Sequence, residues 1–338
     1  MRNREDAFDI TKMILSIFVI GVHAGLYPDI MNPLYRIAVP MFFMMSSYFF
    51  FKSLGQDKTA NKARLKKFVV RNLRLYGFWF VALLPLTLII RDYFAQGFVP
   101  GLLTLLHNFL FYSTFRASWY LIALCTAMVI LYFLSGVTGN KGLLWISAPI
   151  YVLYCLFSNY YGLFGECDLW NSFCNGYRTV FVTLCNNFPA GFLWITLGKM
   201  FAEGKISIPA KVTRWMLPLS VMLLYAEQIT VLHYGLADKT DYYFALVPCC
   251  IALFSLLRGA DVHCSTAPLL RKTSTVVYVL HSSAISVLNL IGGRFLHIPE
   301  GWMAVYLTAS SLMVCIAATF IILRLEKQKG FRWLRYAY

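Results

Sequence analysis

The chain has 338 residues, of which 59% are hydrophobic and only 13% are charged, and its mean hydropathy is +0.64. Soluble domains carry roughly 25% charged residues, so this composition excludes an ordinary soluble enzyme and indicates a membrane protein. The formal charge of +15 does not indicate nucleic-acid binding, because the basic residues are scattered over the connections between apolar segments.

Apolar segments long enough to cross a bilayer recur along the whole chain, each crossing needing about 20 residues. Because they lack an alternation of period two, they predict helices and not a barrel. We expect ten spanning helices, at residues 10–27, 33–52, 68–90, 117–135, 142–160, 178–199, 214–235, 242–258, 272–291 and 301–324. Residues 100–115 are too few to span comfortably and predict an interfacial helix. The fold class is therefore an all-α, polytopic helix bundle that forms a single domain over residues 1–338.

The distribution of basic residues predicts the orientation of this bundle. Most of the 30 Lys and Arg residues lie at the two termini and in the connections after the second, fourth, sixth and eighth spans. The positive-inside rule then places both termini in the cytoplasm of a multi-pass protein of the plasma membrane. The densest basic stretch, KTANKARLKKFVVRNLR, either contacts anionic membrane lipids or binds phosphate.

The first apolar run contains ionisable residues, which are costly inside a bilayer and usually face a cavity or the bundle interior. Lys12 and His23 are eleven residues apart, so they differ by only about 20° around a helix axis and share a face. Asp9 lies one turn before Lys12 on roughly the same stripe. His23 is expected about 16 Å beyond Lys12, close to the middle of the hydrocarbon layer. The sequence thus predicts a polar line that reaches from the membrane surface to its centre.

Later spans carry further polar groups at similar depth. His281 and Glu227 are expected about 14 and 20 Å beyond the basic residues that open their spans, and Asn187 interrupts the sixth span. Such groups either bond neighbouring helices together, with intramembrane hydrogen bonds that contribute about 0.6 kcal/mol on average, or surround one polar cavity together with His23.

The nine cysteines show no metal-ligand spacing, and no residue pattern indicates a bound metal ion. Most of them lie within apolar segments, where a thiol behaves as a small hydrophobic group. Cys167 and Cys174 fall in a predicted outer loop, where they can form a disulfide if that side of the membrane is oxidising.

Several motifs, in order along the chain, resemble those of the acyltransferase family 3 integral membrane proteins. DAFDITKMILSIFVIGVH is similar to the opening of that family, with Asp9 and His23 in place and Lys12 where the family usually has Arg. VPMFFMMSSYFF resembles the next family motif, with Ser46 matching and Ser47 in place of a glycine. RNLRLY, SWYLIAL and STVVYVLHSS resemble later ones, and the matches extend from residue 4 to residue 284.

Within the family, the chain looks most like the membrane domain of the membrane-bound serine racemases linked to vancomycin resistance. Those proteins carry a cytoplasmic, pyridoxal-phosphate-dependent racemase domain after the membrane part. On this resemblance the chain is either a free-standing family member or a piece that ends before such a domain.

The family resemblance implies an acyltransferase that moves an acyl group, expected to be acetyl, from cytoplasmic acyl-CoA to a hydroxyl of a cell-envelope glycan or a small molecule. His23 is expected to act as general base or to carry the acyl group, because imidazole takes up and releases a proton near neutral pH. Asp9 and Lys12 complete the expected catalytic motif. Lys12, Arg71 and Arg74 are expected to hold the donor phosphates, although Lys offers a point charge where Arg offers paired donors.

His281, Trp119 and Tyr120 are expected to position the acyl or acceptor group. The expected partners are membrane lipids, acyl-CoA as a donor substrate and a hydroxyl acceptor, with no tightly bound cofactor.

The alternative is a transport module for a small polar substrate, and the racemase resemblance makes L-serine the candidate. A pocket of ionisable and amide groups near the middle of the membrane suits a transport site equally well. In this hypothesis Glu227, His233 and Asn187 bind the substrate or a proton, and His23 does no chemistry.

Overall fold

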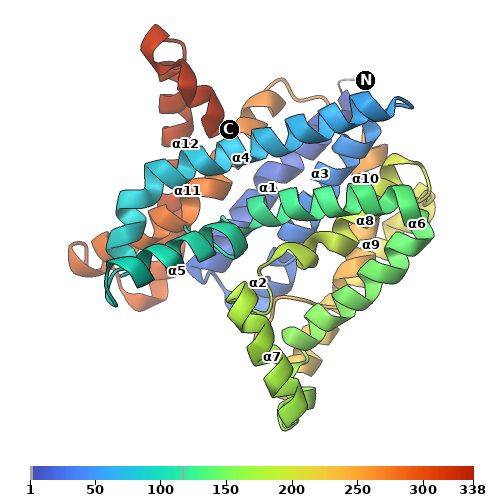
Figure 1. The fold of residues 1–338 in the computed structure, drawn as a ribbon, viewed down its shortest axis with the longest axis horizontal. Coiled ribbons are helices and arrows are strands. Elements are labelled where there is room, and N and C mark those ends of the chain that lie inside the picture. The colour runs from blue at the N-terminus through green and yellow to red at the C-terminus, as the bar shows by residue number, and fades with distance from the viewer. Residues whose placement is uncertain (1–2, 116–117) are drawn as a thin grey trace.

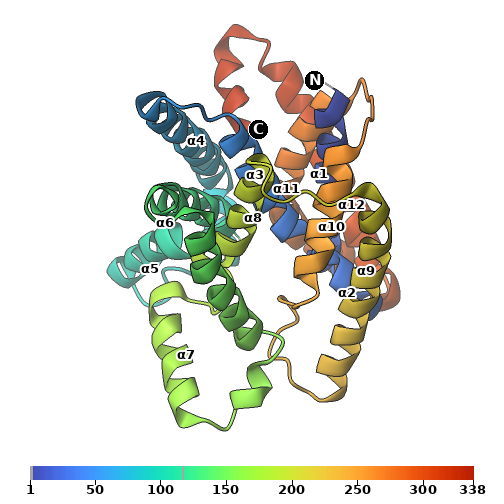
Figure 2. The same ribbon diagram turned by 90° about the vertical axis from the view of Figure 1, so that its right-hand side faces the viewer.

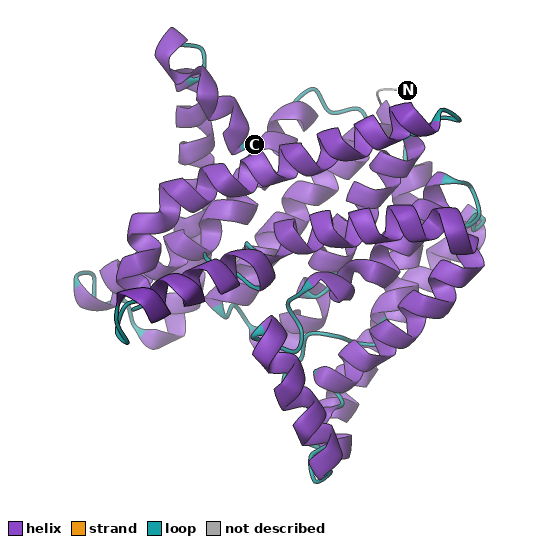
Figure 3. Ribbon diagram, viewed as in Figure 1, coloured by secondary structure: helices purple, strands orange, loops and turns teal. Residues whose placement is uncertain are grey.

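The computed structural model describes residues 3–115 and 118–338, and these residues form helices and loops without a β-strand (Figure 3). The all-α prediction is confirmed. The α-helices are α1 (Asn3–Ala24), α2 (Pro28–Tyr35), α3 (Ala38–Lys52), α4 (Lys58–Ile90), α5 (Phe98–Phe111), α6 (Trp119–Phe157), α7 (Asp168–Phe181), α8 (Phe192–Ala202), α9 (Ala210–His233), α10 (Leu246–Gly259), α11 (Ala267–Arg294) and α12 (Glu300–Leu325). Short 3-10 segments are η1 (Tyr161–Phe164), η2 (Phe188–Gly191) and η3 (Lys329–Ala337).

Seven helical segments of the described chain are long and apolar enough to cross a membrane. They are Glu5–Ala24, Pro28–Lys52, Lys58–Ile90, Trp119–Phe157, Ala210–His233, Ala267–Arg294 and Glu300–Leu325. Three shorter apolar helices accompany them, Phe98–Phe111, Phe188–Ala202 and Leu246–Gly259. The first of these three is the segment for which we expected an interfacial helix.

Two of the predicted spans, 117–135 and 142–160, share the long helix α6. Gly139 interrupts the helical geometry of α6 with a φ of 64°, a conformation that glycine adopts readily because it has no Cβ. The chain changes direction at this point, at the right-hand edge of Figure 1. The two predicted spans are therefore two arms of one bent element.

The predicted sixth span, 178–199, is not a continuous helix. α7 ends at Phe181, and helical structure resumes only with η2 and α8. Pro189 cannot donate a backbone hydrogen bond, and Asn187 donates its side-chain amide to the carbonyl of Thr183 at 3.2 Å. Side-chain bonds of this kind compete with the helical ladder, so the prediction of an unbroken helix is wrong here.

Helix α3 packs closely against α8, which is far from it in the sequence. A Cβ added to Gly198 would lie 2.4 Å from the carbonyl oxygen of Met44, so only glycine permits this approach. Ser47 donates its hydroxyl to the carbonyl of Ile195 at 2.6 Å. The serine that replaces a family glycine therefore has a partner in the neighbouring helix.

The central helix α1 packs against α11 and α12, and both chain termini lie at the same end of the bundle (Figures 1 and 2). We call this end, which also holds Lys12, Arg71, Arg271 and Lys272, the basic end. The segment from η1 to α7 lies at the opposite end (Figure 2), which we call the far end.

We expect Gly198→Ala to destabilise the protein by about 1–3 kcal/mol, because the new methyl group overpacks the contact between α3 and α8. Thermal unfolding in detergent measures the change. Gly136→Ala is the matched control, since a Cβ at Gly136 of α6 meets nothing within 4 Å. Equal unfolding temperatures for the two variants would contradict the close contact.

Candidate functional site

The basic end contains two adjoining cavities of about 320 and 720 Å³. They share five lining residues, Lys12, Ser46, Arg71, Asn72 and Arg271. We call the two together the basic cavity. Cationic side chains of α1, α4 and α11 thus converge on one space, as anion binding requires.

The carboxylate of Asp9 joins two of these cations. Lys12 Nζ lies 3.5 Å from Asp9 Oδ1, and Arg271 Nη1 lies 3.4 Å from Asp9 Oδ2. Asp9 is only 5% exposed, so its charge requires such partners. Asp9 and Lys12 are far from His23 along α1, about 21 and 16 Å by helix rise, and the three residues do not form one catalytic cluster.

Arg71 and Arg74 have different surroundings, although the sequence pairs them. Arg71 lines the basic cavity, whereas the guanidinium of Arg74 lies over the ring of Tyr336, 5.5 Å from its centre. Arg271 also lines the basic cavity, and the sequence alone did not indicate this role. In the sequence, Arg271 is one of several basic residues beside a span. Its contact with Asp9 in the structure distinguishes it from the others.

The C-terminal segment closes one side of the basic cavity. Tyr338 lines the cavity and accepts a hydrogen bond from Lys272 Nζ at 3.0 Å. Burial and a hydrogen bond to the carboxylate of Glu326 raise the pKa of Tyr338 to about 12, so its hydroxyl keeps its proton at neutral pH. Trp79 of α4 donates its indole N–H to the carbonyl of Ala337 at 3.0 Å, which fixes this segment against α4.

A second cavity, of about 540 Å³, lies toward the far end and contains His23, which is in the last turn of α1. We call it the His23 cavity. Its polar lining includes His23, Arg36, Asn186, Lys239 and Asp241, and its aromatic lining is Tyr35, Tyr112, Trp119, Trp194 and Tyr242. An aromatic wall with a few polar groups is typical of a pocket for a small molecule or a sugar.

An ion pair fixes the loop that forms one wall of the His23 cavity. Arg36 Nη1 lies 2.7 Å from Asp241 Oδ1, and Arg36 Nε donates to Asn32 Oδ1 at 2.9 Å. Asn32 in turn donates to the carbonyl of Thr240 at 3.1 Å. The connection between α9 and α10 is therefore held by α2 in one conformation.

Glu227 braces the same loop and does not line either cavity. Its carboxylate accepts the backbone N–H groups of Phe244 and Ala245 at 2.7 and 2.8 Å and the hydroxyl of Tyr160 at 2.8 Å. It thereby fixes the backbone of the two residues that lead into α10. His233 is exposed at the end of α9.

Asn187 also has a bracing position. Its Oδ1 accepts hydrogen bonds from the hydroxyls of Tyr154 and Tyr177, and its side chain is buried. The neighbouring Asn186 lines the His23 cavity instead. Because this segment is not helical, the face on which each asparagine lies could not be derived from helical periodicity.

His281 of α11 lies beside His23, with 5.1 Å between the two ring centres. His281 Nδ1 is 2.9 Å from the carbonyl of Val277, so this nitrogen carries the proton because a carbonyl can only accept. Its Nε2 is buried and has no hydrogen-bond partner among the described residues. Two imidazoles that were predicted at similar depth are thus brought together by the packing of α1 on α11.

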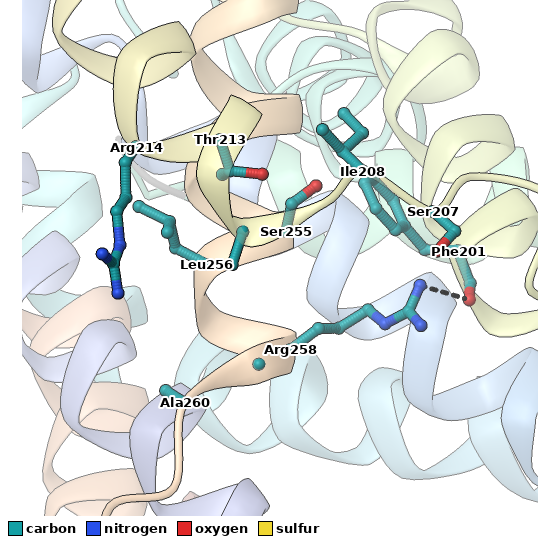
Figure 4. Close-up of a pocket in the computed structure, with 11 residues that line it drawn as sticks. Phe201, Ser207, Ile208, Thr213, Arg214, Ser255, Leu256, Arg258 and Ala260 are labelled. Carbon is teal, nitrogen blue, oxygen red and sulfur yellow. Dashed lines mark hydrogen bonds between the residues drawn. The ribbon is translucent and has the colours of Figure 1, made fainter.

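A further cavity of about 380 Å³ at the ends of α8, α9 and α10 contains Arg214 and Arg258. Figure 4 shows Arg258 extended toward the loop after α8, where its Nη1 donates to the carbonyls of Phe201 and Ile206 at 3.4 and 3.0 Å. Arg214 extends in another direction. The two guanidinium groups do not converge, so Arg258 is interpreted as a brace for the loop.

Cys167 is exposed, Cys174 is buried, and both are free thiols. Among the described residues, no group of three His, Cys, Asp or Glu side chains is arranged to hold a metal ion.

Comparison with known proteins finds a family described as "Acyltransferase domain", which matches residues 5–324. A serine/alanine racemase of Enterococcus gallinarum is 27% identical over 172 residues, which cover 48% of this chain and 24% of that protein. An amino-acid racemase of Enterococcus faecalis is 22% identical over 309 residues, which cover 86% of this chain and 42% of that protein. The chain thus spans less than half the length of these curated relatives. No solved structure matches it.

We expect Glu227→Gln to lower the free energy of unfolding by about 1–2 kcal/mol, because the neutral amide loses charged hydrogen bonds to the backbone N–H groups just before α10. Thermal unfolding in detergent measures this loss. Glu166→Gln is the control, since Glu166 is exposed. If the Glu227 variant kept full stability and lost only ligand binding, the bracing role would be wrong.

Proposed function

The chain belongs to the acyltransferase-domain family, and we propose that it moves an acyl group, with acetyl as the expected group, from cytoplasmic acyl-CoA to a hydroxyl beyond the membrane. The acceptor is a cell-envelope glycan or a small molecule at the far end. In this proposal the protein lies in the plasma membrane with the basic end and both termini in the cytoplasm, as the positive-inside rule predicts.

The observation that carries this proposal is the pair of cavities served by one helix. α1 contributes Lys12 to the basic cavity and His23 to the other cavity. A donor rich in phosphate suits the basic cavity. An acceptor with hydroxyl groups suits the His23 cavity, whose lining combines aromatic rings with amide and charged groups. His23 then stands where a donor arm and an acceptor can meet.

Lys12, Arg71 and Arg271 are the proposed phosphate contacts. Arginine offers a rigid fork of donors that matches phosphate oxygens, whereas lysine is a point charge. The family usually has Arg at the position of Lys12, and Arg271 contributes a guanidinium at the same carboxylate, Asp9. Asp9 is proposed to hold the two cations apart and oriented, which is a positioning role.

His23 is the proposed general base. It accepts the proton of the acceptor hydroxyl while the hydroxyl oxygen attacks the thioester carbonyl, and the CoA thiolate leaves and takes that proton. In the alternative two-step route, an imidazole nitrogen of His23 attacks the thioester carbonyl and CoA leaves as the thiol with the imidazole proton. The acceptor hydroxyl then attacks the acyl-imidazole, the bond from the acyl carbon to the nitrogen breaks, and the imidazole takes the hydroxyl proton. His281, whose ring centre lies 5.1 Å from that of His23, is proposed to orient the His23 ring, as a third group orients the base in other acyl transfers.

Trp119 and Tyr120 are consecutive residues that line different cavities. Trp119 is proposed to contact the acceptor, and Tyr120 is proposed to contact the donor arm.

Transport of a small polar substrate such as L-serine is the second candidate, and the racemase names of the relatives favour it. The residues first assigned to that role, Glu227, His233 and Asn187, do not line the His23 cavity. The pair of Arg36 and Asp241 does line it, and its opposite charges suit the carboxylate and ammonium groups of an amino acid.

We expect Arg71→Ala to weaken acyl-CoA binding about tenfold or more, the effect of losing a charged hydrogen bond to phosphate. Calorimetry with acetyl-CoA on the purified protein measures the affinity. Arg74→Ala is a matched control three residues away, because Arg74 lies against Tyr336 and outside the cavity lining. Equal affinities for the two variants would remove Arg71 from the donor site.

We expect His23→Ala to reduce acyl transfer by about 10²–10⁴-fold, the usual contribution of a general base. Vesicles containing the protein are given labelled acetyl-CoA on one side, and label on the protein and on an added hydroxyl acceptor is counted. His233→Ala, on an exposed histidine, should keep the wild-type rate.

The same vesicles are then tested for uptake of labelled L-serine. Accumulation of serine that survives His23→Ala, together with absence of any acyl label, would contradict acyl transfer and favour transport.

A further inference from the structure

Two helices, α3 and α6, each contribute residues both to the basic cavity and to the His23 cavity. On α3, Phe42 lines the basic cavity and Pro40 lines the His23 cavity, and two residues correspond to about 3 Å along a helix axis. On α6, Tyr120 lines the first cavity and Trp119 the second. The side chains of these neighbouring residues therefore form a layer between two spaces that lie toward opposite ends of the bundle.

This layer is aromatic, and Tyr120 is at its centre. The Tyr120 ring centre lies 4.6 Å from that of Phe43, 5.4 Å from Tyr278 and 6.3 Å from Phe42. Trp119 lies 6.4 Å from both Phe43 and Tyr120. We call Phe42, Phe43, Trp119, Tyr120 and Tyr278 the aromatic septum. These tilted and edge-on contacts are the favourable arrangements for aromatic rings.

The Tyr120 side chain is 7% exposed, and its hydroxyl lies 3.3 Å from the hydroxyl of Ser46. Ser46 itself lines the basic cavity. The ring is therefore held by packing on several sides and by a hydroxyl contact at the cavity wall. Rotation about χ1 moves such a ring as a unit between staggered positions.

We propose that the aromatic septum, with Tyr120 as its moving part, is the gate of a passage that joins the two cavities through the protein. In the structure the gate is closed. Where a bilayer blocks polar solutes with a hydrocarbon core roughly 30 Å thick, the barrier between these two cavities is a layer of aromatic rings. Apolar constrictions of this kind block water and ions by dewetting. When the gate is open, the acyl-bearing arm of a donor in the basic cavity reaches His23. The sealing of the two cavities does not depend on the proposed acyl transfer. Only the passage of the acyl arm through the open gate rests on that proposed function.

The seal is tested by proton leakage, which requires no substrate. The full chain is reconstituted in vesicles that contain a pH-sensitive dye, and a potassium diffusion potential drives protons inward. Tyr120→Ala should raise the rate of proton entry about tenfold or more over the wild type, because it removes the centre of a dewetted layer. Tyr132→Ala is the control, on the same helix but in the lining of neither cavity, and should give the wild-type rate.

Folding of each variant is checked by its thermal unfolding in detergent. If Tyr120→Ala does not fold, Tyr120→Leu takes its place and should also leak more than Tyr132→Leu, because a smaller side chain leaves a gap between the rings. If folded Tyr120 variants admit protons no faster than the wild type, the proposed gate is wrong.

The passage is tested with Tyr120→Trp, whose larger ring blocks the opening while the cationic donor contacts remain. At saturating acetyl-CoA, we expect the acyl label on His23 or the acceptor to fall at least about tenfold. Unchanged labelling would overturn the passage of the acyl arm at Tyr120. If no acyl label appears on His23 or the acceptor even with the wild type, the proposed acyl transfer is wrong. The rate of proton entry then still tests whether the aromatic septum seals the passage.

Discussion

Hydrocarbon offers no partner to a charge or to a free backbone amide, and the way in which each intramembrane polar group meets this constraint determines what it does. Asp9 is neutralised by Lys12 and Arg271. Glu227 accepts hydrogen bonds from the two backbone amides just before α10 and from Tyr160. His23 instead borders a cavity, so it remains accessible to a small molecule. The same cost of burial thus accounts both for the bracing contacts of Asp9 and Glu227 and for the position of His23 at a cavity.

Two segments with an irregular, non-helical backbone line the His23 cavity. The stretch after α7 contributes Asn186, and the loop before α10 contributes Lys239 and Asp241. Tyr242 joins the two segments by donating its hydroxyl to the carbonyl of Cys185 at 2.9 Å. Irregular backbone at membrane depth is tolerated where protein buries it or where it borders a cavity. The bracing groups hold this wall, which pre-organises the cavity before any ligand enters.

The two cavities have complementary chemistry, and this is what an acyl transfer across a membrane needs. Cations of three helices converge at the basic end, and aromatic and polar groups line the cavity of His23. A protein with two such spaces must also keep them apart, because a continuous wet path would dissipate ion gradients. The aromatic rings around Tyr120 are the proposed barrier between them.

The sequence by itself determined the helical class, most of the apolar segments and the common face of Lys12 and His23, because these depend on composition and on the local period of a helix. It also indicated that His23 and His281 lie at similar depth. Only the tertiary structure decided which polar groups face a cavity. Asp9 and Arg271 are 262 residues apart, Arg74 meets Tyr336, and Asn187 lies in a segment that is not helical at all. The rotation and contacts of each helix are set by partners distant in the chain, and no local period contains that information.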